Sequence, residues 1–201
     1  MRKVGYLLAA VVLVCAAAAM AGEQVQLELT SFEPAQNAWG SYNQGGAVSS
    51  AARGQAQTKG GTWSLEWNYD FTKTVTSQNT YASLGIWREI PGAPVNFSLW
   101  VYGDGSGNTL VYRTSDAGGQ TFQGEVCKLD FTGWKQVTFP ATSNAHWGGK
   151  NDGKARYPLR LSELIINRPA VLSAANRMGT IYLDLPSAVT NIDESQMLGL
   201  E

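Results

Sequence analysis

Apolar and polar residues alternate along much of the chain after residue 22. The segment Trp63 to Phe71 places a large apolar side chain at every second position, and Val25 to Thr30 alternates in the same way. Successive side chains of a β-strand point to opposite faces, so a period of two predicts strands with one buried face. The small side chains between Gly46 and Arg53 predict a short strand that packs closely against a neighbour.

Further segments of this kind predict six more strands, separated by clusters of Gly, Pro, Asn and Asp. They are Ala82 to Glu89, Val95 to Tyr102, Thr109 to Thr114, Lys135 to Phe139, Leu159 to Asn167 and Thr180 to Leu185. After Gly22 no segment has the apolar spacing of an amphipathic helix. The glycine-rich segment Gly103 to Asn108 predicts a hairpin turn. Eight or nine strands predict an all-β fold, a two-sheet antiparallel jelly-roll β-sandwich.

The first 21 residues have the three parts of a secretory signal peptide. Arg2 and Lys3 precede an apolar run from Leu7 to Ala19, and Ala19-Met20-Ala21 is a small-residue cleavage site. The apolar run is too short for a membrane span. We therefore expect a signal peptide over residues 1–21, one domain over 22–190 and a flexible tail over 191–201. The mature protein is expected to be secreted, whether extracellular, periplasmic or at the cell surface.

Charge and cysteine content narrow the classes of partner. The chain has 15 basic and 16 acidic residues, and export removes Arg2 and Lys3. The mature net charge of about −3, without clusters of either sign, makes nucleic acids and anionic membranes poor partners. Only Cys127 would remain after cleavage, so no intramolecular disulfide can form. We expect this lone thiol to be buried and inert.

One predicted strand has aromatic side chains on the face that should point away from the core. Phe97, Leu99 and Val101 can fill the core, which turns Trp100 and Tyr102 to the opposite face. Neighbouring segments add rings and guanidinium groups to a candidate surface: Trp87, Arg88, Tyr112 and Arg113. Sugars have apolar C–H faces that stack on such rings and hydroxyl groups that need polar partners. The alternative is that loops cover these rings as ordinary core.

A polar loop from His146 to Gly153 supplies a second group of candidate sugar contacts, namely His146, Trp147, Asn151 and Asp152. Trp147 lies between flexible residues, where core packing does not readily explain a tryptophan. His146 is the only histidine, and a hydrogen-bonded structural role is favoured over a catalytic one. Asn151 and Asp152 also fit plain turn chemistry.

No catalytic constellation is recognisable, so we expect no enzyme activity and assign no catalytic residue. Asp104 opens a segment like a calcium loop, but the twelfth position is Ser115 instead of glutamate. Two alternatives stay open. The first is a jelly-roll polysaccharide lyase or glycoside hydrolase, in which His146 with Tyr112 or Arg113 would supply the chemistry. The second is a structural or adhesive module that binds a partner protein.

With these residues in view, the chain resembles the galactose-binding-like jelly rolls that serve as carbohydrate-binding modules in secreted polysaccharide-degrading systems. The resemblance covers Gln24 to Val189. Its carriers are Leu29-Thr30-Ser31-Phe32-Glu33, Gly60-Gly61-Thr62-Trp63-Ser64-Leu65, Leu99-Trp100-Val101-Tyr102-Gly103-Asp104-Gly105-Ser106-Gly107, Gly133-Trp134-Lys135 and Gly179-Thr180-Ile181-Tyr182-Leu183-Asp184. It implies a polysaccharide or oligosaccharide ligand, association with secreted glycoside hydrolases and a monomer.

The same resemblance implies a structural calcium ion between the first and last strands. The matching ligands are the carboxylates of Glu33 and Asp184 and the backbone carbonyl of Lys59. Hard oxygen ligands of this kind suit Ca²⁺. Leu185 stands where such modules often have a second acid, which weakens the match, and two solvated carboxylates without a metal are the alternative.

Overall fold

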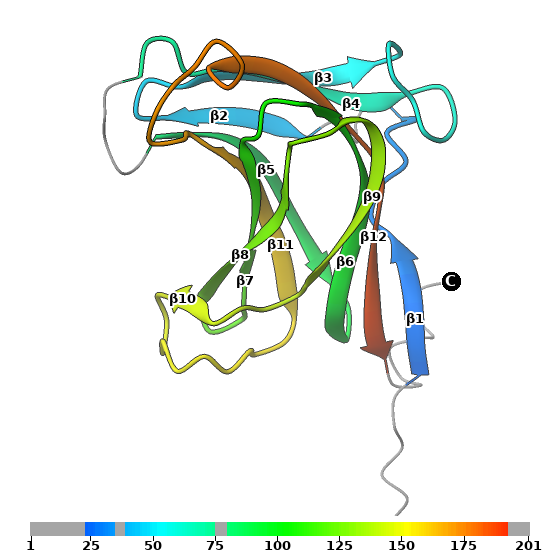
Figure 1. Cartoon of the computed structure of the whole chain (residues 1–201). Helices are drawn as coiled ribbons and strands as arrows, with labels where there is room; N and C mark the ends of the chain where they lie inside the picture. Colours follow the sequence, from blue (N-terminus) through cyan, green and yellow to red (C-terminus); the bar gives the residue numbers. More distant parts are fainter. Residues whose placement is uncertain (1–22, 35–38, 75–79, 193–201) are drawn as a thin grey trace, which may run out of the picture.

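The computed structural model describes residues 23–34, 39–74 and 80–192, which form two antiparallel sheets packed face to face (Figure 1). The first sheet has the order β3 (Val48–Gly54), β4 (Ser64–Asp70), β12 (Met178–Ile192), β6 (Ala93–Asp104) and β9 (Thr132–Pro140), with β1 (Glu23–Glu28) also paired to β12. The second has the order β10 (Ala145–Trp147), β8 (Thr121–Lys128), β7 (Thr109–Ser115), β11 (Leu159–Asn167), β5 (Tyr81–Ile90) and β2 (Gly40–Gln44). The predicted all-β sandwich is confirmed.

Alternation along the strands places the core between the two sheets. Phe97, Leu99 and Val101 are buried there as predicted, and Trp67, on β4 of the same sheet, has no exposed surface. The second sheet contributes the inward side chains of β5, β7 and β11. Tyr112 is one of them, because it follows the inward-facing Leu110 at a spacing of two residues.

The predicted hairpin at Gly103 to Asn108 is wrong. β6 pairs with β12 and β9 in the first sheet, whereas β7 pairs with β8 and β11 in the second. The segment therefore crosses from one sheet to the other. Gly105 and Gly107 both have positive φ, so the glycine signal correctly indicated a tight change of direction but not its destination.

β12 is the central strand of the first sheet. Residues 178–183 pair with β4 and residues 187–192 pair with β1, while β6 pairs along the other edge. Leu185 has a φ of 47° at the irregularity between the two halves. The strand continues to Ile192, whose side chain is buried, and so extends two residues beyond the predicted domain boundary at residue 190. The remainder of the predicted tail and the predicted signal peptide lie outside the described residues.

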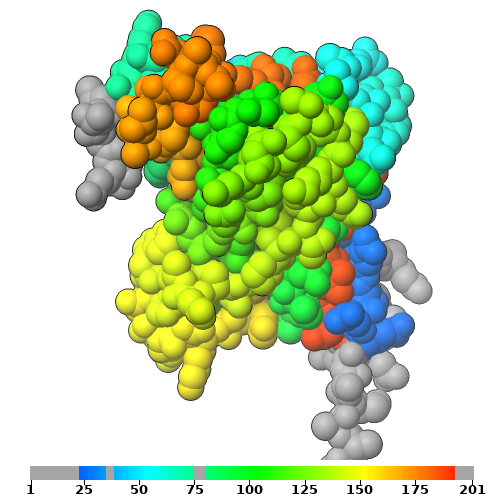
Figure 2. Space-filling view, in the orientation of Figure 1, coloured from blue at the N-terminus to red at the C-terminus, as the bar shows by residue number. Residues whose placement is uncertain are grey.

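Three strands were not predicted from the sequence: β2, β8 and β10. The regular structure of the described segments is entirely β, and they contain no helix long and apolar enough to cross a membrane. In Figure 2 the segment around β10, coloured yellow, protrudes at the lower left of the molecule. This protruding segment contains Trp147 and the polar loop that follows it.

Core packing generates a stability prediction. Replacement of Phe97 by Ala removes a ring that packs against Phe139 at 5.6 Å between centroids and is 1% exposed. We expect the free energy of unfolding to fall by about 3–5 kcal/mol, the usual cost of a Phe-to-Ala change in a core. Urea unfolding followed by tryptophan fluorescence measures it. Val171→Ala, at a side chain that is 78% exposed, is the control. A loss below about 1 kcal/mol for Phe97→Ala would contradict the packing described.

Candidate functional site

The outward face of the second sheet gathers aromatic rings around a charged centre. We call this surface the aromatic face, and it comprises Tyr42, Tyr81, Trp87, Trp147, Arg113, Gln123 and Glu163. The strand register brings these side chains together, since Arg113 is paired with Gln123 on β8 and with Glu163 on β11. Trp87 and Trp147 are 61% and 42% exposed, so their rings are open to solvent.

The aromatic face has an apolar floor beneath these rings. Val111 and Ile165 are paired across β7 and β11 and are buried, yet neither belongs to the core cluster between the sheets. Ser83, paired with Ile165 and with Tyr42, is also buried. Outward-facing residues of a sandwich sheet are usually exposed, so the burial of these three shows that neighbouring side chains cover them.

A nearly buried carboxylate, that of Glu163, holds four strands of the aromatic face together. Its Oε2 accepts hydrogen bonds from the hydroxyls of Tyr42 on β2 and of Ser83 on β5, the second at 2.5 Å. Its Oε1 accepts a hydrogen bond from Arg113 Nη1 on β7 at 2.9 Å. Burial, together with the bond to Glu163, raises the pKa of Tyr42 to about 12, so this hydroxyl stays protonated at neutral pH.

Arg113 lies between two rings. Its guanidinium carbon is 5.2 Å from the centroid of Tyr81 and 5.3 Å from that of Trp147, both within cation–π range. Its Nε donates to Gln123 at 2.7 Å. Burial lowers the pKa of Arg113, but its bonds to Tyr81 and Glu163 outweigh burial and raise it. The cation is thus fixed in its charged form between the two rings.

A bulge in β5 sets the position of Trp87. Two residues of β5, Ile86 and Trp87, oppose the single residue Ser162 of β11, and Trp87 has a φ of 52°. A bulge of this kind re-aims a side chain. The indole nitrogen of Trp87 lies close to Gly85, where a side-chain carbon would be 3.4 Å from it. Arg88 is exposed beside this bulge.

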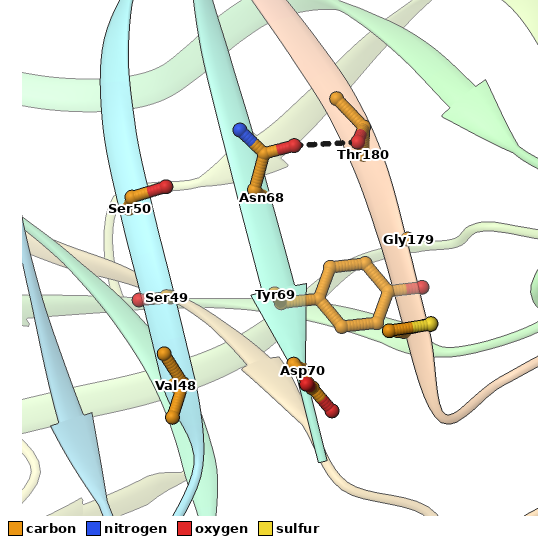
Figure 3. A pocket seen from close by; sticks show the side chains of 9 residues that line it. Val48, Ser49, Ser50, Asn68, Tyr69, Asp70, Gly179 and Thr180 are labelled. Atoms are coloured by element: carbon orange, nitrogen blue, oxygen red, sulfur yellow. Dashed lines mark hydrogen bonds between the residues drawn. The ribbon is translucent and has the colours of Figure 1, made fainter. Parts of the chain in front are cut away.

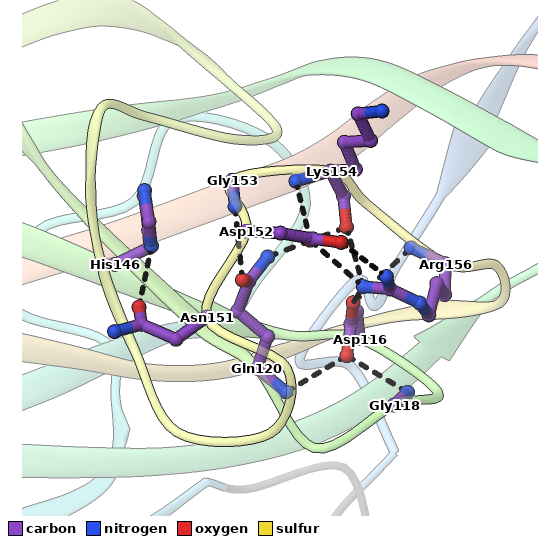
Figure 4. A network of polar contacts seen from close by, with 9 residues as sticks. All are labelled: Asp116, Gly118, Gln120, His146, Asn151, Asp152, Gly153, Lys154 and Arg156. Carbon is purple, nitrogen blue, oxygen red and sulfur yellow. Dashed lines mark hydrogen bonds and ion pairs between the residues drawn. The ribbon is translucent and has the colours of Figure 1, made fainter.

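The loop that follows Trp147 is held by a fully buried carboxylate, Asp116 (Figure 4). Its Oδ1 accepts bonds from the backbone amides of Gly118 and Gln120, both at 2.8 Å. Its Oδ2 accepts the backbone amide of Arg156 at 3.2 Å and lies 3.6 Å from the guanidinium of that residue. Arg156 also pairs with Asp152 at 2.6 Å, which lowers the pKa of Asp152.

His146 and Asn151 support this same loop. The Nδ1 of His146 is 2.7 Å from the Oδ1 of Asn151, and the ring packs 6.1 Å from that of the buried Phe122. Asn151 has a φ of 50°, which agrees with turn chemistry. The structure therefore engages three of the four predicted contacts of this loop, His146, Asn151 and Asp152, in bonds within the loop itself, and leaves the ring of Trp147 exposed.

The other predicted site residues are divided between the two sheets. The placement of Tyr112 in a sugar-binding surface is wrong, because its ring is buried in the core and its hydroxyl donates to the carbonyl of Thr142. Trp100 and Tyr102 are outward-facing residues of β6 in the first sheet, so they do not adjoin Trp87, Arg113 and Trp147. The alternation of residues along a strand shows which side chains share a face, but it does not show which of the two sheets the strand joins.

The proposed calcium ligands are held by hydrogen bonds in an arrangement that only partly fits a metal. Asp184 is fully buried, and its Oδ2 accepts the backbone amides of Lys59 and Gly60 at 2.8 and 3.0 Å. In a trans peptide the carbonyl of Lys59 points opposite to the amide of Gly60, hence away from Asp184. The Lys59 carbonyl and the Asp184 carboxylate therefore do not face a common position in this arrangement.

Glu33, like Asp184, accepts hydrogen bonds from backbone amides, but from residues a little further along the chain. Its Oε1 accepts the backbone amides of Thr62 and Trp63 at 2.8 and 3.0 Å. Within residues 23–34, 39–74 and 80–192, no three side chains of His, Cys, Asp or Glu come together in a way that could hold a metal ion. Asp184 fixes the 59–63 segment to β12, and Glu33 fixes it to the segment that follows β1.

Four residues of the aromatic face were missed by sequence reasoning: Tyr42, Tyr81, Gln123 and Glu163. Glu163 carried a usable signal, because the alternation that begins at Leu159 and Leu161 predicts an apolar residue at its position. An acid at such a position needs a buried partner. Tyr42 and Gln123 belong to strands that were not predicted, and Tyr81 precedes its predicted strand by one residue.

Comparison with known proteins identifies relatives of this fold. The family model described as carbohydrate binding domain (family 11) matches residues 14–184. A family 11 carbohydrate-binding module from Clostridium thermocellum, solved with a β-1,3-1,4-mixed-linked tetrasaccharide, is 16% identical with a TM-score of 0.58, covering 84% of this chain and 98% of that chain. The family 11 module of a cellulosomal cellulase from the same organism is 16% identical with a TM-score of 0.56, covering 85% and 96%.

One curated relative matches over a short segment. A mannan endo-1,4-beta-mannosidase of Bifidobacterium adolescentis (strain ATCC 15703 / DSM 20083 / NCTC 11814 / E194a) is 48% identical over 46 residues, which are 23% of this chain. The matched segment is only 4% of that enzyme.

The network around Asp116 generates a prediction about the loop that follows Trp147. In Asp116→Ala three backbone amides and Arg156 lose a buried acceptor, at a cost of about 1–3 kcal/mol for an unsatisfied group. We expect amides of residues 118–120 and 153–156 to exchange hydrogen much faster, while β4 and β12 stay protected. Hydrogen exchange measured by mass spectrometry tests this. Asp130→Ala, at an exposed carboxylate, is the control. Unchanged protection in Asp116→Ala would contradict the role assigned to this carboxylate.

Proposed function

This chain belongs to the family 11 carbohydrate-binding domains, and from that premise we propose that its aromatic face is the surface that binds glycan. The protein is a non-catalytic carbohydrate-binding module with a jelly-roll β-sandwich fold. Family membership excludes the lyase or hydrolase considered from the sequence. The part of the proposal that goes beyond the family is the location of the site and the use of ring stacking.

The arrangement of Tyr81, Arg113 and Trp147 is the single observation that carries the proposal. Two rings flank a guanidinium group that is already fixed by Gln123 and Glu163. Pyranose rings can stack their C–H faces on the aromatic rings, and their hydroxyls can bond to the polar groups between them. Because the bonds around Arg113 exist before a ligand arrives, little side-chain entropy is lost on binding.

The charges of the aromatic face favour a neutral glycan. Arg113 on β7 is paired with Glu163 on β11, and Arg160 on β11 is paired with Glu89 on β5 at 3.1 Å. Paired charges leave no net field to attract an anionic polysaccharide. The sugar hydroxyls would then supply most of the polar contacts.

The relatives indicate which glycans to test first. One relative was solved with a mixed-linked β-1,3-1,4 tetrasaccharide, and another is a mannan endo-1,4-beta-mannosidase. We propose a β-linked polysaccharide as ligand, with mixed-linked glucan and β-mannan as the leading candidates. We also propose that the protein is secreted through the signal peptide of residues 1–21, acts as a monomer and associates with secreted glycoside hydrolases. A structural or adhesive role in binding a partner protein is the remaining alternative.

Ring removal tests the aromatic face. We expect Trp147→Ala and Tyr81→Ala each to weaken glycan binding about tenfold or more, because loss of a central aromatic contact typically costs about 2 kcal/mol, and tenfold corresponds to about 1.4 kcal/mol. Affinity electrophoresis in gels containing mixed-linked β-glucan or β-mannan, followed by calorimetry with the retained glycan, measures the change. Val171→Ala should bind like the wild type. Retardation of both ring variants equal to that of the wild type would show that the site lies elsewhere.

Calcium addition tests the metal. A structural calcium ion stays a prediction from the resemblance, but we propose that Glu33 and Asp184 serve mainly as acceptors for backbone amides. We therefore expect the melting midpoint in millimolar calcium to equal that in chelator within about 1 °C. A filled site at one hundred times its dissociation constant would add about 2.7 kcal/mol, or several degrees for a domain of this size. A rise of that order would restore the calcium hypothesis.

A further inference from the structure

The outward face of the first sheet carries a second line of rings, on the side of the molecule opposite to the aromatic face. Trp134 on β9 is paired with Tyr102 on β6, Tyr102 with Tyr182 on β12, and Tyr182 with Glu66 on β4. These four side chains, which we call the cross-strand row, therefore occupy adjacent positions on four neighbouring strands. Each is partly exposed.

The rings of the cross-strand row touch edge to face. Tyr102 lies 5.5 Å from Trp134 and 5.8 Å from Tyr182 between centroids, with interplanar angles of 79° and 89°. An antiparallel sheet with one solvated face usually has polar side chains there. Three adjacent rings are not needed to fill the core, which the inward residues of the same strands already occupy. An exposed aromatic cluster of this kind marks a binding surface.

A pocket of about 330 Å³ opens at one end of the cross-strand row (Figure 3). Hydrogen bonds connect the two features. Thr180 donates to the Oδ1 of Asn68 at 2.6 Å, and Asn68 Nδ2 donates to Glu66 at 3.2 Å. Thr180 precedes Tyr182 by two residues on the same face of β12. The side chains on the open side of the pocket are Val48, Ser50, Asn68, Asp70, Met178 and Thr180.

The lining of the pocket combines apolar and hydrogen-bonding groups. Val48 and Met178 are each 54% exposed and form apolar walls, while Ser50, Asn68 and Asp70 supply hydroxyl, amide and carboxylate groups. Its volume is at the small end of ligand pockets, about 300–1,000 Å³, which suits a single sugar unit. The lining contains no Lys or Arg, and Asp70 would repel an acidic sugar.

We propose that this pocket and the cross-strand row form a second carbohydrate site, which binds a neutral glycan chain across the strands of the first sheet. One sugar unit enters the pocket, and the following units stack along Tyr182, Tyr102 and Trp134. The choice of ligand chemistry rests on the proposed function, whereas the location rests on the pocket and the rings alone. Since the two sites lie on opposite sheets, one molecule joins two glycan chains.

The test uses mixed-linked β-glucan and β-mannan, as soluble oligosaccharides for calorimetry and as polymers for light scattering. Ser50→Trp fills the pocket from an exposed position on the edge strand β3, and Trp134→Ala removes one ring of the row. The double variant Tyr81→Ala with Trp147→Ala disables the aromatic face instead. Val171→Ala is the control, and circular dichroism confirms the fold of each variant.

We expect the wild type to bind two oligosaccharides per chain and to cross-link the polymer. Ser50→Trp and Trp134→Ala should each weaken one of the two binding events at least tenfold and abolish cross-linking, without weakening the other event. The aromatic-face double variant should keep the event that they lose. Equal effects of Ser50→Trp and Trp134→Ala support a single continuous site.

Three results would overturn the second site. In the first, the wild type binds one oligosaccharide per chain and the aromatic-face double variant binds none. This result leaves the proposed function intact and contradicts the second site. In the second, the wild type binds two oligosaccharides, but Ser50→Trp and Trp134→Ala weaken neither binding event. This result also contradicts the second site. Self-association of the wild type that Ser50→Trp prevents, with a single glycan bound, assigns the face to a protein contact instead. A different result would support the first-sheet site. If the aromatic-face double variant still binds glycan and Ser50→Trp does not, the aromatic face is not the glycan site and the first-sheet site is.

Discussion

The ion pair between Arg113 and Glu163 is the interaction on which the aromatic face depends. Both groups lie largely out of water, and a charge in such a place is stable only when it is paired and hydrogen-bonded. Glu163 meets this requirement with groups from β2, β5 and β7, and Arg113 meets it with Gln123 and two rings. The same contacts that satisfy the charges therefore fix Tyr42, Tyr81 and Trp147 around Arg113 and Glu163.

Alternation along the strands determined how much could be predicted from the sequence. The period of two correctly identified eight strands and the buried set Phe97, Leu99 and Val101, and the small side chains of Gly46 to Arg53 identified a ninth strand. It also correctly turned Trp100 and Tyr102 outward. It could not say which sheet each strand would join, because strand order is set by long-range pairing. For that reason Trp87, Trp100 and Tyr112, expected on one surface, lie respectively on the second sheet, on the first sheet and in the core.

Loops and irregular positions explain the remaining differences. Trp87 is exposed because a bulge in β5 re-aims it, and one extra residue in a ladder is invisible in a hydropathy pattern. Strand β2, which contributes Tyr42, is short and mostly exposed, so it has almost no apolar period. In the polar loop from His146 to Gly153, Asn151 bonds to His146 and Asp152 pairs with Arg156. Composition indicates such groups without indicating their partners.

The position of β12 has a consequence for how the molecule is assembled. It is the last of the described strands along the chain, yet it lies between β4 and β6 and also pairs with β1. Before β12 pairs, β4 and β6 have no shared neighbour, and the first sheet consists of the pairs β3–β4 and β6–β9 with β1 unpaired. Acquisition of the native topology must therefore wait for contacts between distant parts of the chain, which is the condition that slows folding in proteins of high contact order.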